Sequence, residues 1–118
     1  MKSGLGGHYI PEIGNYLLGD QYRSDSKTVC TEAYLYAKTL NITGQDLWVF
    51  DIDETTLSNL KYYADHGFGV EPYNAAAFNA WVDLGEAPAL QESLKLYNKL
   101  VSLGVKIVLL TGRPLKRL

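Results

Sequence analysis

The sequence of 118 residues contains only one cysteine, Cys30, so it cannot form an internal disulfide framework. No apolar run approaches the roughly 20 residues that a membrane-spanning helix needs. The formal net charge is −2, with 11 basic against 13 acidic residues, which gives no electrostatic reason to expect a nucleic acid or a membrane surface as partner. Residues 1–7 have one lysine but no apolar core behind it, so they do not form a signal peptide as they stand.

The composition, with 47% hydrophobic residues, is that of an ordinary globular chain long enough for one small domain. Residues 1–24 are rich in glycine and aromatic residues with weak periodicity, so we expect a loose N-terminal arm with one helical turn near residues 13–18. The remaining residues, 25–118, form the expected core. Residues 58–86 hold no regular strand pattern and are interpreted as a small aromatic cap inserted into that core.

A first long helix is expected from Ser24 or Asp25, either of which can cap its N-terminus, to about Leu40. Cys30 lies in this helical pattern, where a small buried residue is expected rather than a nucleophile. The predicted apolar face of the helix comprises Val29, Ala33, Tyr36, Ala37 and Leu40.

Two strands are predicted on either side of a second helix. Residues 47–50 are apolar or aromatic with strand preference, and residues 105–110 are a continuous apolar run that is broken only by Lys106, which predicts a strand buried on both faces. Pro88 and Ala89 are expected to open the helix between them, and Gly104 to end it in the left-handed conformation. The apolar positions of that helix are Leu90, Leu94, Tyr97, Leu100 and Val101. Strand, helix and strand together predict a parallel crossover unit and an α/β fold.

Two carboxylates, Asp51 and Asp53, follow directly on the first strand. In an extended segment they point to the same face, roughly 7 Å apart. Because like charges repel and burial penalises both, such a pair favours a hard divalent cation such as Mg²⁺. The alternative is an acidic turn after a strand, since a D-x-D pattern alone is short.

Thr111, Gly112 and Arg113 follow the second strand. Ligands of open parallel sheets bind beyond the carboxyl ends of the strands, so these residues and the two aspartates are expected at one crevice. A hydroxyl and a glycine amide are suitable donors to the oxygens of a phosphoryl group. Arg113 either clamps a substrate anion or pairs with an acidic neighbour.

The aromatic residues of the predicted cap leave two interpretations open. Tyr62, Tyr63 and Trp81 either stack on a leaving group or form the core of the cap, and the second interpretation is favoured. His66 lies just before a glycine and is expected in a surface turn. Glu54 either tunes the site or points to solvent.

These motifs resemble those of a known family. The segment DIDET at residues 51–55, with its preceding strand, resembles the first motif of the haloacid dehalogenase superfamily, and LLTGR at residues 109–113 resembles the second. Residues 19–114 more closely resemble plant class B acid phosphatases and vegetative storage proteins. Segments typical of that group are SNL at 58–60, YYADHG at 62–67 and EAPAL at 86–90. The resemblance implies part of a Rossmann-like phosphatase domain with a small helical cap.

The resemblance also implies roles for individual residues. Asp51 is the expected nucleophile, which forms an aspartyl-phosphate, and Asp53 the expected acid and base for the leaving alcohol and the attacking water. Magnesium is expected on the Asp51 carboxylate and the Asp53 main-chain carbonyl. Thr111 is expected to hydrogen-bond the phosphoryl group, with further substrate contacts from Thr55, Gly112 and Arg113.

The sequence departs from the family pattern in several places. The third motif, a lysine, and the fourth, an acidic pair, follow the second strand in the family and are absent here; Lys116 lies too close to Thr111 to replace the lysine. We therefore expect a fragment or truncated product of a phosphatase that is inactive and marginally folded on its own. Lys61 and Gln91 stand where relatives commonly have proline.

The predicted function is magnesium-dependent hydrolysis of a small phosphate monoester. The first alternative is a non-catalytic storage or relic protein of the same family, although storage-type relatives can lose the nucleophile that Asp51 retains. The second is a D-x-D sugar transferase, which would not need Thr111 to Arg113 at the next strand end. The resemblance suggests a secretory or vacuolar protein, and the sequon at Asn41 matters only in that case.

Overall fold

The computed structural model describes residues 12–117. Residues 12–18 are helical, which confirms the predicted turn near 13–18, and residues 1–11 of the expected arm lie outside the described part. The following elements are, in chain order, α2 (Asp20–Thr39), β1 (Leu47–Asp51), α3 (Leu60–Asp65), the 3-10 helix η1 (Gly67–Gly69), α4 (Ala75–Leu84), α5 (Gln91–Ser102), β2 (Lys106–Leu110) and the 3-10 helix η2 (Leu115–Arg117). No helix among residues 12–117 is long and apolar enough to span a membrane.

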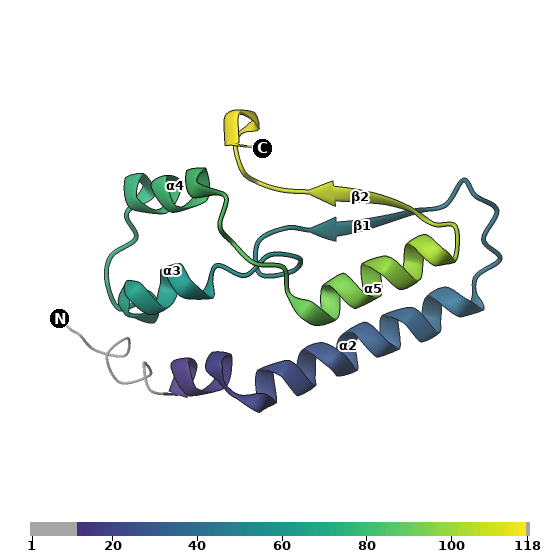
Figure 1. Ribbon diagram of the computed structural model, residues 1–118, viewed down its shortest axis with the longest axis horizontal. Coiled ribbons are helices and arrows are strands. Elements are labelled where there is room, and N and C mark those ends of the chain that lie inside the picture. The colour runs from purple at the N-terminus through teal and green to yellow at the C-terminus, as the bar shows by residue number, and fades with distance from the viewer. Residues whose placement is uncertain (1–11, 118) are drawn as a thin grey trace.

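The two strands β1 and β2 pair in parallel, with Leu47 opposite Lys106 and Asp51 opposite Leu110. Helix α5 makes the crossover between them, as predicted from the strand–helix–strand pattern. Both strands point toward the end of the molecule where α3 and α4 lie (Figure 1). Their carboxyl ends, with the residues that follow, therefore meet beside the predicted cap.

The core lies between the sheet and the two long helices, which lie on the same side of the sheet (Figure 1). It consists of Ala37 from α2, Phe50 from β1, Leu96 and Leu100 from α5, and Val105 before β2. Leu100 and Ala37 are fully buried. Burial of such apolar side chains is the main favourable contribution to folding.

The buried faces of the long helices differ from the predicted ones. On α2 the residues that contact the core are Cys30, Ala33, Tyr34 and Ala37, while Val29, Tyr36 and Leu40 are exposed. On α5 Leu96 and Leu100 are buried, while Leu94, Tyr97 and Val101 are exposed. Several periodic sets of apolar residues fit each helix, and tertiary packing selects one of them.

Strand β2 is not buried on both faces among the described residues. Leu109 and Leu110 are 55% and 61% exposed, and Val49 of β1 is 55% exposed. The helices that pack on the sheet cover only one of its faces, so the continuous apolar pattern predicted more burial than residues 12–117 provide.

Both long helices begin at other residues than predicted. Helix α2 starts at Asp20, after Gly19 in extended conformation, and an acidic residue in the first turn is favourable there. Helix α5 starts at Gln91 because the preceding main chain is bonded elsewhere: Ser58 N donates to Pro88 O and Leu90 N to Thr56 O. Gly104 ends α5 with a φ of 88°, in the predicted left-handed conformation.

Helices α3 and α4 occupy the region interpreted as an aromatic cap. Tyr62 is buried there against Phe78, with ring centroids 5.1 Å apart, and lies 6.4 Å from the Trp81 ring. The ammonium group of Lys61 lies 5.9 Å from the Trp81 ring centroid. These two helices therefore pack against each other mainly through aromatic rings.

Candidate active site

Asp51 is the last residue of β1, and its carboxylate is held by the loop that follows. Thr55 Oγ1 donates to Asp51 Oδ2 over 3.0 Å. The loop is a tight turn in which the main-chain N–H groups of Thr55, Thr56 and Leu57 all donate to the carbonyl oxygen of Ile52. This turn presents the Asp51 carboxylate, which is exposed, at the carboxyl end of the strand.

The prediction that Asp51 and Asp53 share a strand face assumed that the strand continues to Asp53, and this assumption is wrong. Strand β1 ends at Asp51, and the chain turns immediately, with Glu54 at a φ of 60°. The alternation of side chains in an extended segment therefore does not extend to Asp53. The two carboxylates have separate partners: Asp51 contacts Thr55, whereas Asp53 contacts Asn59 and the distant Arg113.

Asp53 forms an ion pair with Arg113, which follows β2. Arg113 Nε lies 3.1 Å from Oδ1 and 3.2 Å from Oδ2 of Asp53, and Arg113 Nη2 also donates to Oδ1. Asn59 Nδ2 donates to Oδ1 as well, over 2.8 Å. Burial acts to raise the pKa of Asp53, but the donors from Arg113 and Asn59 and the arginine charge oppose it, and the pKa is lowered. Of the two interpretations of Arg113, the structure shows pairing with an acidic neighbour.

Thr111 directly follows Leu110, which is the register partner of Asp51 at the end of the neighbouring strand. The main-chain N–H of Arg113 donates to Thr111 Oγ1 over 3.0 Å. This bond fixes the turn after β2 and places the hydroxyl, the exposed Gly112 and the arginine at one strand end. The structure thus brings Asp51, Thr55 and Thr111 to the end of the sheet at which both strands have their carboxyl ends, as predicted from the parallel topology.

Asn59 is the site residue that sequence reasoning missed. It is fully buried, and its Oδ1 accepts bonds from Trp81 Nε1 over 3.3 Å and from Arg113 Nη2 over 3.4 Å. Its main-chain N–H donates to Glu54 Oε1 over 2.6 Å, so one oxygen of Glu54 is used within the loop. An asparagine before a short helix usually indicates a cap, so the sequence contains no signal for this role.

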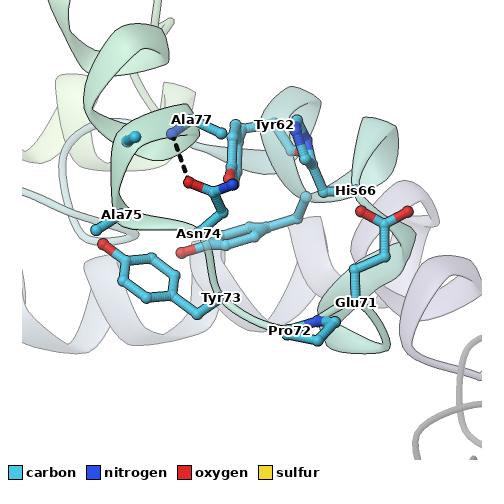
Figure 2. A pocket seen from close by; sticks show the side chains of 10 residues that line it. Tyr62, His66, Glu71, Pro72, Tyr73, Asn74, Ala75 and Ala77 are labelled. Atoms are coloured by element: carbon cyan, nitrogen blue, oxygen red, sulfur yellow. Dashed lines mark hydrogen bonds between the residues drawn. The ribbon is translucent and has the colours of Figure 1, made fainter.

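A cavity of about 990 Å³ opens in the cap (Figure 2). Tyr62, Tyr63, His66 and Tyr73 line it, together with Glu71 and the N-terminal turn of α4. His66 lies in the turn after α3, as expected, but it is half-buried: its ring stacks on Tyr62 with centroids 3.9 Å apart, and its Nδ1 donates to the Tyr62 carbonyl over 2.7 Å. Tyr62 is therefore cap core, whereas Tyr73 is 74% exposed.

The available oxygen ligands for a cation are few. Among residues 12–117 no group of three or more His, Cys, Asp or Glu side chains lies close enough together to hold a metal ion. Within this part of the chain, the main-chain carbonyl of Asp53 and Oδ1 of Asp51 accept no hydrogen bond. These two free oxygens are hard ligands, which suits Mg²⁺.

The fold and the site define an α/β protein whose polar groups gather at the carboxyl ends of parallel strands. Comparison with known proteins is more specific. Residues 8–118 match the family described as HAD superfamily, subfamily IIIB (acid phosphatase), and the chain belongs to this family.

Similar proteins come from several plants. The chain is 56% identical over 102 residues to the stem 28 kDa glycoprotein of Glycine max, a match that covers 86% of this chain and 40% of the relative. It is 47% identical over 111 residues to acid phosphatase 1 of Solanum lycopersicum, covering 88% and 44%. It is 41% identical over 105 residues to vegetative storage protein 2 of Arabidopsis thaliana, covering 86% and 40%. The chain thus spans about two fifths of the length of these relatives.

Proposed function

We propose that the protein hydrolyses small phosphate monoesters through an aspartyl-phosphate on Asp51. The observation that supports this proposal is the position of Asp51 at the carboxyl end of β1, opposite Leu110, the residue that directly precedes Thr111, in a chain of an acid phosphatase family. An exposed carboxylate at such an edge is accessible to a phosphoryl group, and a neighbouring hydroxyl can donate to its oxygens.

The other site residues have distinct roles in this proposal. Asp53 donates a proton to the leaving alcohol and then accepts one from the water that attacks the aspartyl-phosphate. Arg113 holds Asp53 in place through its ion pair. Thr111 and the Gly112 amide bind the phosphoryl oxygens, and Thr55 orients the Asp51 carboxylate.

The proposed cofactor is Mg²⁺, held by Oδ1 of the Asp51 carboxylate and the main-chain carbonyl oxygen of Asp53, which accept no hydrogen bond within residues 12–117. When bound, the ion would neutralise negative charge on the phosphoryl group and the nucleophile. If these oxygens bind it, the melting temperature of the complete protein should rise with the logarithm of free Mg²⁺. A melt that neither millimolar Mg²⁺ nor a chelator changes would contradict this ligand assignment.

The nucleophile is tested by Asp51→Asn in the complete protein. This change should abolish nearly all hydrolysis of p-nitrophenyl phosphate, because the amide is not a nucleophile of comparable strength. Asp65→Asn is the matched control, since Asp65 is an exposed aspartate at the end of α3, and it should retain wild-type turnover. Wild-type turnover in Asp51→Asn would disprove the covalent mechanism.

A storage role without catalysis is the second candidate, because two relatives are named vegetative storage proteins. The family membership gives no support to the sugar-transferase alternative. A complete protein that folds and accumulates but hydrolyses no phosphate monoester would favour storage.

The proposed substrate is a small molecule rather than a nucleic acid or a membrane. The cap cavity, lined by Tyr63 and Tyr73, is the proposed site for its leaving group.

A further inference from the structure

We propose that Asn59 is a positioning residue that fixes the Asp53 carboxylate and joins it to the cap. This inference rests on the proposed function for its catalytic consequence, and on hydrogen bonds of the described residues for its geometry. Asn59 itself contacts no reacting atom in the proposal. It acts through Asp53, the proposed acid and base.

The side-chain amide of Asn59 connects three segments that are distant in sequence. Its Nδ2 donates to Asp53 Oδ1 in the loop after β1, over 2.8 Å. Its Oδ1 accepts from Arg113 Nη2 after β2, over 3.4 Å, and from Trp81 Nε1 in α4, over 3.3 Å. The residue is fully buried, so water does not compete for these bonds.

The chemistry of these partners requires an amide. An amide supplies donors on nitrogen and an acceptor with two lone pairs on oxygen, and both lone pairs are used here. A leucine of similar size would leave the indole N–H of Trp81 without this acceptor. An aspartate would keep the acceptor but place a second carboxylate against Asp53, where like charges repel.

Asn59 restrains the Asp53 carboxylate from a second direction, in addition to the ion pair with Arg113. Arg113 holds the Asp53 carboxylate from the segment after β2, whereas Asn59 holds it from the segment that begins α3. A carboxylate held from two structural elements is oriented more firmly than one held from a single element. Proton transfer depends on that orientation. Through Trp81, the same amide links the position of α4 to the orientation of Asp53.

The first test compares leaving groups in the complete protein. Asn59→Leu should lower kcat/KM roughly tenfold or more for an alkyl phosphate, whose leaving group needs a proton, because hydrogen bonds to charged groups contribute about that much. It should lower kcat/KM far less for 2,4-dinitrophenyl phosphate, whose leaving group needs no proton. Asn98→Leu, which changes an exposed asparagine of α5, is the matched control and should change neither value.

An equal loss for both substrates would show that Asn59 has only a structural role, and no loss would show that it has none. If Asn59→Leu does not fold, the isosteric Asn59→Asp takes its place, with the same expected dependence on the leaving group. If that dependence is absent in Asn59→Asp, the proposal is overturned.

The second test does not depend on activity. In wild-type protein the indole N–H of Trp81 should exchange slowly with solvent, as observed by NMR, because it is bonded to a buried acceptor. It should exchange faster in Asn59→Leu and stay slow in Asn98→Leu. Equal exchange in wild type and Asn59→Leu would overturn the proposal even in an active enzyme. Slow exchange in a wild-type protein without phosphatase activity would instead disprove the proposed function and leave the hydrogen-bonded link intact.

Discussion

The core and the cap of this chain are held together by different interactions. The core packs aliphatic and aromatic side chains from α2, α5 and the two strands into one cluster, around the fully buried Leu100. In the cap, α3 and α4 pack mainly through aromatic rings. The cap also depends on polar contacts: Trp81 donates to Asn59, which donates in turn to Asp53 in the loop after β1, and the ion pair between Arg117 and Asp83 joins η2 to α4 over 2.9 Å.

This difference separates what stabilises the fold from what shapes the site. Apolar burial in the core is non-directional and determines whether the domain folds. The polar contacts at the cap are directional, and they begin in the same loop that carries Asp53. A change in the core should therefore affect the whole domain, whereas a change in the cap should remain local.

The largest effect on stability is expected from Leu100→Ala. Truncating this fully buried leucine should lower the free energy of unfolding by about 2–5 kcal/mol, through lost burial and a residual cavity. Urea unfolding of the complete protein measures this change. Leu94→Ala, in the same helix but at a position that is 49% exposed, is the control and should have a much smaller effect. Equal losses in the two variants would contradict the assigned core face of α5.

A smaller and local effect is expected from Asn74→Ala in the cap. The Asn74 side chain caps α4 by accepting from Ala77 N over 3.0 Å, as Figure 2 shows. Its loss should lower the stability of that helix by about 1 kcal/mol. Amide exchange should accelerate in α4 and remain unchanged in α5. Asn79→Ala, inside α4 rather than at its cap, is the control; acceleration in α5 would show that cap and core unfold together.

The smallest effect is expected from a polar contact at the amino end of β1. Thr43 N donates to Asp46 Oδ2 over 2.7 Å, and this bond lowers the pKa of Asp46, an exposed group. The lowered pKa means that the contribution of Asp46 to stability is present above the ordinary value of 3.8 and is lost as the pH falls through the lower folded value.

Asp46→Asn should therefore be slightly less stable than wild type near neutral pH. The difference should vanish in acid, where wild type is protonated too. A difference between wild type and Asp46→Asn that grows as the pH falls would contradict the assigned bond.

The sequence predicted the parallel crossover and the strand ends because strong local signals marked them. Residues 47–50 combine strand preference with an abrupt change to carboxylates, and Gly104 marks the end of α5. The faces of α2 and α5 were only partly predicted, since several apolar stripes fit each helix and the packing partners selected one of them. The predicted start of α5 was wrong because the main chain of residues 88–90 forms hydrogen bonds with the loop after β1. These are long-range interactions, which a local sequence pattern does not contain.

The site was predicted only as far as its strand-end residues. Asp51 and Thr111 follow from the rule for parallel sheets, and the structure places Asp51 at the end of β1 and Thr111 directly after the adjacent strand β2. The ion pair of Arg113 with Asp53 was one of two open interpretations. The role of Asn59 could not be predicted, because it depends on three segments that meet only after folding. The catalytic roles themselves remain predictions.

The central claim, that Asp51 becomes phosphorylated, is tested most directly by trapping the intermediate. The complete protein is mixed with a phosphate monoester and Mg²⁺, quenched, reduced with borohydride and analysed by peptide mass spectrometry. Reduction of an aspartyl-phosphate yields homoserine, which we expect at position 51 and nowhere else. It should be absent without substrate and absent in Asp51→Asn. Homoserine at another aspartate, or none in a protein that turns over, would contradict the account.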